Sequence, residues 1–203
     1  MFRLSTFFLI ILFLIGSCKQ KHIVNDKPIS RIISLSPHIT EIIYSLGQQD
    51  KLIAVSDYCN YPPDTQKKER IGGVLNPNME KMLSLKADLF IGTAGHSELA
   101  GKLEAQQLKT VLLPNDRLQD IFTTIDSLGT LLDCTIKADS VKAALQDSLL
   151  FYQQQAHKLN IQPEALLVIG REPGSARKIT ASGSNTFLDE IWILLKGKNA
   201  FSH

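Results

Sequence analysis

The sequence predicts an α/β protein with three parts: a Rossmann-like lobe built on a parallel sheet, a long connecting helix, and an incomplete second α/β lobe. Three observations lead to this prediction. Short apolar stretches alternate with helical patterns up to residue 117, which is typical of parallel strands covered by helices on both faces. The stretch 138–162 contains neither glycine nor proline. After Pro163 the alternation of strand and helix begins again.

The first element is a buried strand over residues 32–35, and a helix follows it directly. Ser36 is a favourable N-cap, and Pro37 fits the first helical position, where no backbone N–H is needed. Gly47 supplies the C-terminal stop. The apolar residues of this helix, which recur on one face, are Ile39, Ile42, Ile43 and Leu46.

Three more strands are predicted in the first lobe, at 52–55, 89–91 and 111–113, because each is an apolar run bounded by polar turns. Asn78 is the expected N-cap of a helix before the middle one of these strands. A further helix precedes the last strand. The first lobe therefore spans residues 29–117, and it lacks a glycine-rich phosphate loop.

Residues 118–162 are predicted to form a helical connector that includes a long backbone helix, which at about 1.5 Å per residue reaches across a whole lobe. The remaining stretch, 163–203, shows one clear strand at 166–169 and one helix at 187–195. So few elements cannot close a hydrophobic core. We therefore expect the second lobe to be incomplete and His203 to be a premature end; the alternative is a compact variant that dimerises.

The amino terminus has the pattern of a secretion signal. Arg3 precedes an apolar run over residues 7–15, which is shorter than the roughly 20 residues that span a membrane. Small residues follow, and then Cys18. Residues 1–17 resemble the signal peptide of a bacterial lipoprotein, which implies that Cys18 carries the lipid and that 18–28 is a tether. Ordinary secretion with an incidental cysteine is the alternative.

Composition gives no reason to expect nucleic-acid binding, because the 203 residues carry a net charge of only +2 and no basic run. Cys59 and Cys134 lie far apart in the predicted fold. We expect both to be unpaired, even in a compartment that permits disulfides. No Cys/His cluster has the spacing of a structural zinc site.

Several motifs occur together between Arg31 and Gly92: an SLSP turn, a loop SDYCNYP, a loop RIGG, and the segment NPNMEKMLSLKADL before a strand. In order and spacing they resemble the first lobe of the helical-backbone (class III) substrate-binding proteins of ABC importers. The resemblance implies a binding protein, lipid-anchored on the periplasmic side of a membrane, that presents a metal chelate to an importer permease. Cobalamin is the first choice of ligand, and a ferric siderophore or haem comes next. No cofactor for catalysis is expected.

Ligands of open parallel sheets bind beyond the carboxyl ends of the strands. The loops at those ends supply the candidate ligand-binding residues. The two tyrosines among them offer flat apolar faces with a hydroxyl, and the two arginines are suited to carboxylates or phosphates on a chelate. The candidates are Ser36, Pro37, His38, Asp57, Tyr58, Tyr61, His96, Arg171 and Arg177.

Glu80 is the candidate for contact with the permease. The resemblance implies this role, because relatives place a glutamate here that engages permease arginines. A carboxylate in the first turn of a helix also interacts favourably with the positive end of the helix dipole, which accounts for the residue without a partner.

Two other classes of function stay open at this point. His38 and His96, with Asp57, are candidates for direct binding of a divalent metal, although such sites need three or four converging ligands. His96 is also a candidate axial ligand for the iron of haem or for cobalt. An α/β hydrolase is the remote alternative, because no G-x-S-x-G elbow occurs in the chain.

Overall fold

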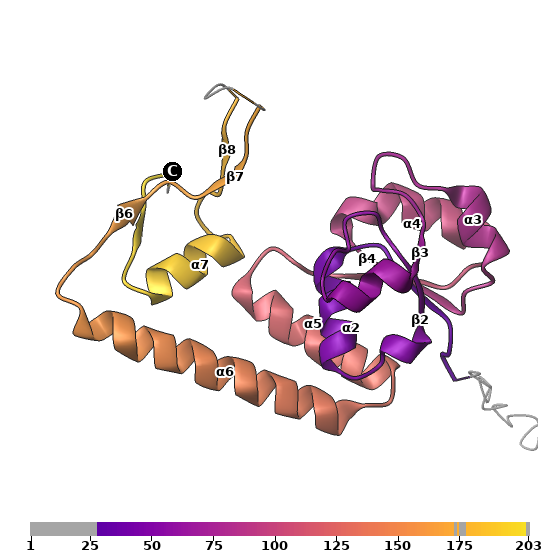
Figure 1. Cartoon of the computed structure of the whole chain (residues 1–203), viewed down its shortest axis with the longest axis horizontal. Coiled ribbons are helices and arrows are strands. Elements are labelled where there is room, and N and C mark those ends of the chain that lie inside the picture. Colours follow the sequence, from indigo (N-terminus) through magenta and orange to yellow (C-terminus); the bar gives the residue numbers. More distant parts are fainter. Residues whose placement is uncertain (1–27, 173, 175–177, 202–203) are drawn as a thin grey trace, which may run out of the picture.

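The computed structural model describes residues 28–172, 174 and 178–201. Figure 1 shows a compact first lobe, a long helix leading away from it, and a smaller second lobe at the far end of that helix. The candidate lipidation residue Cys18 and the candidate ligand residue Arg177 lie outside the described residues.

The first lobe is built on a five-stranded sheet in the order β3-β2-β1-β4-β5, and all four strand pairs are parallel. The strands are β1 (Ile32–Ser34), β2 (Leu52–Val55), β3 (Glu69–Arg70), β4 (Leu89–Thr93) and β5 (Thr110–Leu113). The central strand β1 comes first in sequence. The next two strands, β2 and β3, extend the sheet on one side of it, and β4 and β5 extend it on the other. All five strands therefore end at the same edge, which we call the carboxyl edge.

Helices cover both faces of this sheet, as the sequence predicts. One face packs against α2 (Pro37–Ser45), α5 (Leu118–Leu131) and the start of α6 (Thr135–Lys158). The other face packs against α3 (Met79–Ser84) and α4 (Ser97–Glu104). Each face has its own apolar core, because the alternating residues of buried β1 and β4 point to opposite sides. Three short 3-10 helices complete the lobe: η1 (Gln49–Lys51), η2 (Pro63–Lys67) and η3 (Ala94–His96).

Helix α6 has 24 residues, which corresponds to a rod of about 36 Å. Only Ala138, near its start, is buried, where it packs against Gly129 of α5. Val141 and Leu145 also pack, partly buried, against the core of the first lobe. Beyond them the helix leads away to the second lobe (Figure 1). Among the described residues, no helix combines the length and the apolar character needed to cross a membrane.

The second lobe consists of two small strand pairs and one helix. β6 (Glu164–Ala165) pairs in parallel with β9 (Lys198–Asn199), and β7 (Val168–Gly170) pairs antiparallel with β8 (Thr180–Ala181). In sequence, helix α7 (Phe187–Leu194) follows β8 and precedes β9.

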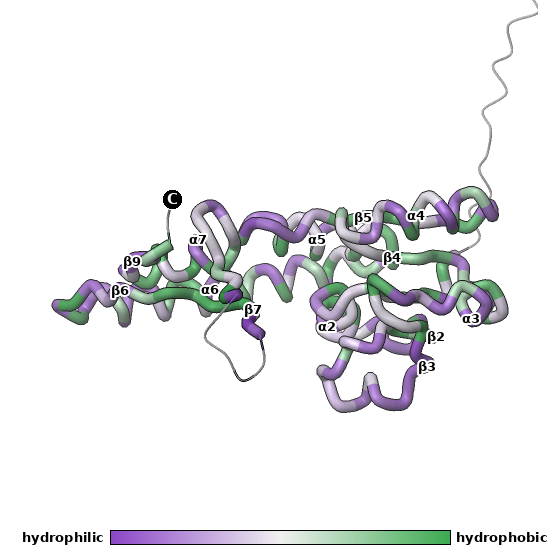
Figure 2. Tube along the Cα trace, turned by 90° about the horizontal axis from the view of Figure 1, so that it is seen from above, coloured by the Kyte–Doolittle hydropathy of each residue, from purple (hydrophilic) through white to green (hydrophobic). Residues whose placement is uncertain are grey.

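The strand predicted at 166–169 is displaced in the structure. Leu166 and Leu167 lie between β6 and β7, in an apolar stretch visible in Figure 2. The sequence pattern marks apolar residues, whereas a strand forms only where a partner strand supplies hydrogen bonds, and β8 pairs with 168–170. Ile169 remains 61% exposed. The described part of the second lobe thus leaves much apolar surface uncovered.

Candidate functional site

The turn between β1 and α2 lies at the centre of the carboxyl edge. Ser36 is the N-cap of α2 and Pro37 occupies the first helical position, as predicted. The Ser36 hydroxyl does not cap the helix; its Oγ is hydrogen-bonded to Nδ1 of His38 at 3.0 Å. This bond fixes the orientation of the His38 ring at the start of α2.

His96 is held at the end of β4, next to this turn. The backbone N–H of Thr93 donates to its Nδ1 at 3.2 Å. A backbone N–H can only donate, so Nδ1 must be the accepting nitrogen of the neutral ring, and the proton resides on Nε2. Ligation of a metal through Nε2 requires the opposite tautomer. The geometry therefore argues against His96 as an axial ligand.

His38, which is half-buried, and His96, which is buried, lie close enough to interact electrostatically, and we call them the histidine pair. In both rings Nε2 is closed to solvent and has no hydrogen-bond partner among the described residues. Burial lowers the pKa of His38, and the neighbouring His96 ring lowers it further. Within the described residues no three side chains of His, Cys, Asp or Glu converge as a metal site would require. The direct-metal alternative thus lacks a third protein ligand there.

This pair leads to a prediction about acid stability. His38 has a lower pKa in the folded protein than in the unfolded chain, so below the unfolded pKa of about 6.5 the unfolded chain takes up a proton that the folded protein resists. Stability is therefore present above this pH and falls as the pH decreases. We expect the free energy of unfolding, measured in urea, to fall more between pH 7.5 and pH 5.0 for the wild type than for His38→Gln. Equal losses would contradict the prediction.

The SDYCNYP loop follows β2 and carries the two candidate tyrosines, which are 61% (Tyr58) and 65% (Tyr61) exposed. Arg70 of β3 holds this loop in place. Its Nη1 donates to the carbonyl oxygens of Ser56 at 2.9 Å and Cys59 at 2.8 Å, and its Nη2 donates to that of Thr65 at 3.3 Å. Sequence reasoning did not single out Arg70, because three backbone acceptors leave no pattern in the side chains.

The RIGG loop, which follows β3, lies against the ring of Tyr58. A Cβ at Gly73 would lie 2.9 Å from Cε2 of Tyr58, so the ring lies against bare backbone. Asp57 connects the two loops, since its Oδ1 accepts from the N–H of Gly72 at 3.2 Å and its own N–H donates to the Gly72 carbonyl. Asp57 thus fixes the loop that presents Tyr58.

Cys59, in the SDYCNYP loop, is fully buried. Its Sγ lies 3.2 Å from the hydroxyl oxygens of Thr40 and Ser56. Cys59 and Cys134 are both free thiols, which confirms that neither is paired with the other.

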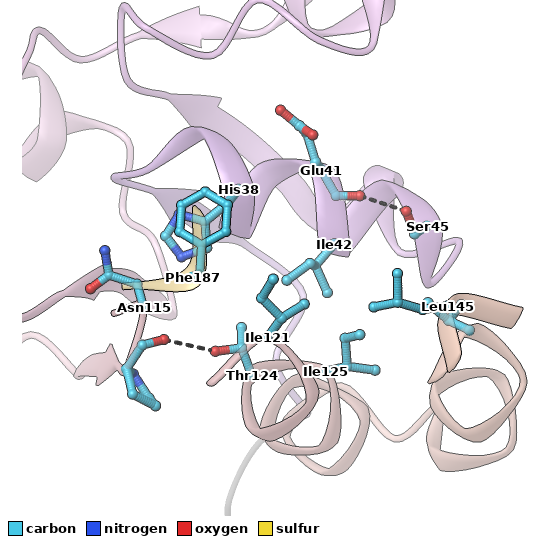
Figure 3. Close-up of a pocket in the computed structure, with 12 residues that line it drawn as sticks. His38, Glu41, Ile42, Ser45, Asn115, Ile121, Thr124, Ile125, Leu145 and Phe187 are labelled. Carbon is cyan, nitrogen blue, oxygen red and sulfur yellow. Dashed lines mark hydrogen bonds between the residues drawn. The ribbon is translucent and has the colours of Figure 1, made fainter. Parts of the chain in front are cut away.

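A groove of about 410 Å³ opens beside the carboxyl edge, between α2, α5, α6 and α7 (Figure 3). Its walls are mainly apolar. His38, Asn115 and Phe187 lie toward one end of it, while Leu145 lies toward the other, and the Glu41 carboxylate points away from it. Sequence reasoning missed this groove, because its walls come from elements distant in the chain.

The other candidates lie apart from this cluster. Glu80 is exposed in the first turn of α3, whose predicted N-cap Asn78 accepts from the N–H of Lys81 at 2.9 Å. Arg171 is exposed after β7 of the second lobe. The structure thus places the two histidines and the tyrosine loop at the carboxyl edge, whereas Glu80 lies in the first turn of α3, which begins after the loop that follows β3.

Comparison with known proteins agrees with this architecture. An uncharacterised ABC transporter substrate-binding lipoprotein of Bacillus subtilis, YvrC, is 31% identical over 193 residues, which are 92% of this chain and 60% of YvrC. The vitamin B12-binding protein BtuF of Vibrio cholerae superposes with a TM-score of 0.73 at 30% identity, over 86% of this chain and 67% of that one.

A haem-binding protein of Pseudomonas aeruginosa shares the fold, with a TM-score of 0.77 at 23% identity over 86% of this chain and 64% of its own. The chain thus spans about two thirds of the length of these relatives, or less. The profile of the family described as "Periplasmic binding protein" matches residues 32–203. With its parallel-sheet lobe, bridging helix and strand-end loops, the chain belongs to the periplasmic binding protein family.

Proposed function

We propose that this protein is the substrate-binding component of an ABC importer and that it captures a metal chelate, with cobalamin as the first choice. The observation that carries the proposal is the pair of exposed tyrosines in one loop at the carboxyl edge, a loop whose backbone Arg70 binds and whose Tyr58 ring lies against Gly73. Flat apolar faces with a hydroxyl suit a large macrocycle. The 30% identity to the vitamin B12-binding protein supports cobalamin over haem, since the haem-binding protein shares the fold alone.

The rest of the proposal concerns place and partners. The protein acts on the periplasmic side of a membrane, attached through lipid on Cys18, and delivers its ligand to the permease without chemical change. The name of YvrC, a substrate-binding lipoprotein, supports the anchor. Arg171 and Arg177 are proposed to contact carboxylates or phosphates of the chelate from the second lobe.

A titration tests the ligand. Protein beginning at Lys19 is titrated with cyanocobalamin, haem and ferric siderophores, and binding is followed by absorbance and by the fluorescence of Trp192. We expect saturable binding of cyanocobalamin that weakens about tenfold or more in a Tyr58→Ala/Tyr61→Ala variant. Tyr152→Ala is the matched control, because Tyr152 is equally exposed but lies on α6. Binding of none of these chelates would refute the proposal.

Glu80 is proposed to contact arginines of the permease. Glu80→Ala should leave chelate affinity unchanged, because the residue lies on α3 and not in a strand-end loop. It should weaken docking, since removing the counter-charge of a buried partner costs about 2 kcal/mol or more. Solution binding and reconstituted transport are measured side by side, with Glu104→Ala on α4 as the control. A Glu80 variant that docks normally but loses chelate would reverse the assignment.

A further inference from the structure

The second lobe is joined covalently to the first at one point. Helix α6 carries the chain away, and residues 159–163, which have no regular secondary structure, connect it to β6. A rod followed by such a joint permits the lobe beyond it to swing. A second point of attachment is needed to fix the separation of the lobes.

The structure contains such a second attachment, where α7 returns to the start of α5 (Figure 1). Oε1 of Glu190 accepts from Nε of Arg117 at 2.8 Å, and its Oε2 accepts from the N–H of Leu118 at 2.7 Å. Beside them, the N–H of Phe187 donates to the carbonyl of Asp116 at 2.8 Å. One carboxylate from the second lobe thus binds the amino-terminal end of a first-lobe helix, where negative charge is favourable.

Hydrogen bonds within each lobe hold both sides of this contact. On α5, Oδ2 of Asp120 accepts from the N–H groups of Asp116 and Arg117, each at 2.9 Å, and so fixes the turn that receives Glu190. On α7, Asp189 is buried and accepts from the N–H of Asn185 at 3.0 Å and from the Nδ2 of Asn199 at 2.9 Å. The Glu190 carboxylate therefore joins two helix ends that each have hydrogen bonds of their own.

The attachment also lies next to the carboxyl edge, because residues 114–117 directly follow β5. We infer that Glu190 is a positioning residue that fixes the second lobe against the first and thereby sets the width of the groove beside the carboxyl edge, which Phe187 of α7 lines. The consequence for ligand affinity rests on the proposed function, whereas the effect on lobe separation does not.

The test measures the distance between the lobes without ligand. Spin labels are placed at Leu75 and Ile179, one exposed residue in each lobe, through a non-canonical amino acid that spares the native cysteines. The distance distribution should be narrow in the wild type and clearly broader in Glu190→Ala. Glu190→Gln and Arg117→Met, which each keep part of the contact, should fall between them. Glu98→Ala is the matched control, because it breaks an ion pair of 2.7 Å within α4.

A distribution for Glu190→Ala as narrow as that of Glu98→Ala would overturn the inference. If Glu190→Ala loses helical circular dichroism, Glu190→Gln takes its place, and a distance distribution as narrow as that of Glu98→Ala would again overturn the inference. Affinity for cyanocobalamin should fall about threefold or more in Glu190→Ala, by slower association or faster release. If no variant binds cyanocobalamin, the proposed ligand is wrong, and the distance distributions still decide the role of Glu190.

Discussion

Replacing Arg70 with methionine is expected to weaken chelate binding about tenfold and to destabilise the first lobe by about 2–3 kcal/mol. The guanidinium binds two backbone carbonyls of the loop that carries Tyr58 and Tyr61, and a third carbonyl, that of Thr65, in the adjoining η2. Bonds to a charged donor are worth about 1.5–3 kcal/mol, and their loss leaves half-buried carbonyls without a donor. Urea unfolding and titration with cyanocobalamin measure the two effects.

Arg31→Met is the control for this prediction. Arg31 also donates to backbone carbonyls, those of Leu85 at 2.8 Å and Lys86 at 3.3 Å, but it precedes β1 at the opposite edge of the sheet. It should lower stability without a comparable loss of affinity. If the two variants lose affinity equally, the loss reflects general destabilisation and not the position of the tyrosine loop.

The second large effect is expected at the crossing of α5 and α6. A Cβ at Gly129 would lie 2.5 Å from the Cβ of Ala138, which is buried, so Gly129→Ala forces the two helices apart. We expect a loss of about 3 kcal/mol, the upper range for overpacking a core. Gly101→Ala on α4 is the control, since nothing lies within 4 Å of its Cβ and alanine favours a helix.

A double variant tests the physical reason for this effect. Gly129→Ala/Ala138→Gly moves one methyl group from α6 to α5 and keeps the volume of the crossing unchanged. The double variant should lose less stability than the sum of the losses in Gly129→Ala and Ala138→Gly, because the two positions touch. Strict additivity in urea unfolding would show that close packing is not the cause.

The elements that the sequence predicts well are those with a local cause. The buried strands β1, β2, β4 and β5 are runs of apolar residues, and Ser36, Pro37 and Asn78 mark helix starts by their own chemistry. The strand β3 escaped notice because Glu69–Arg70 is short and charged, and only its pairing with β2 makes it a strand. In the second lobe, strand position depended on partners, which an apolar pattern does not identify.

The candidate site divides in the same way. Loops after strands could be located from the sequence, and the structure places the histidines and tyrosines at one edge of the sheet. The tautomer of His96 depends on one N–H of Thr93, and the bond between Glu190 and Leu118 joins residues 72 positions apart. Neither contact leaves a local signal, because each arises only when the chain is folded.

The exposure of α6 affects how such a chain can vary. Since Ala138 is its only buried residue, most of its side chains face water, where substitutions are usually nearly neutral. Insertions differ, because each added residue lengthens the helix by about 1.5 Å and rotates everything beyond it by about 100°. A change of one residue would turn Glu190 away from the end of α5, whereas an insertion of about two full turns would restore the direction but not the reach. This helix therefore tolerates changes of composition far better than changes of length.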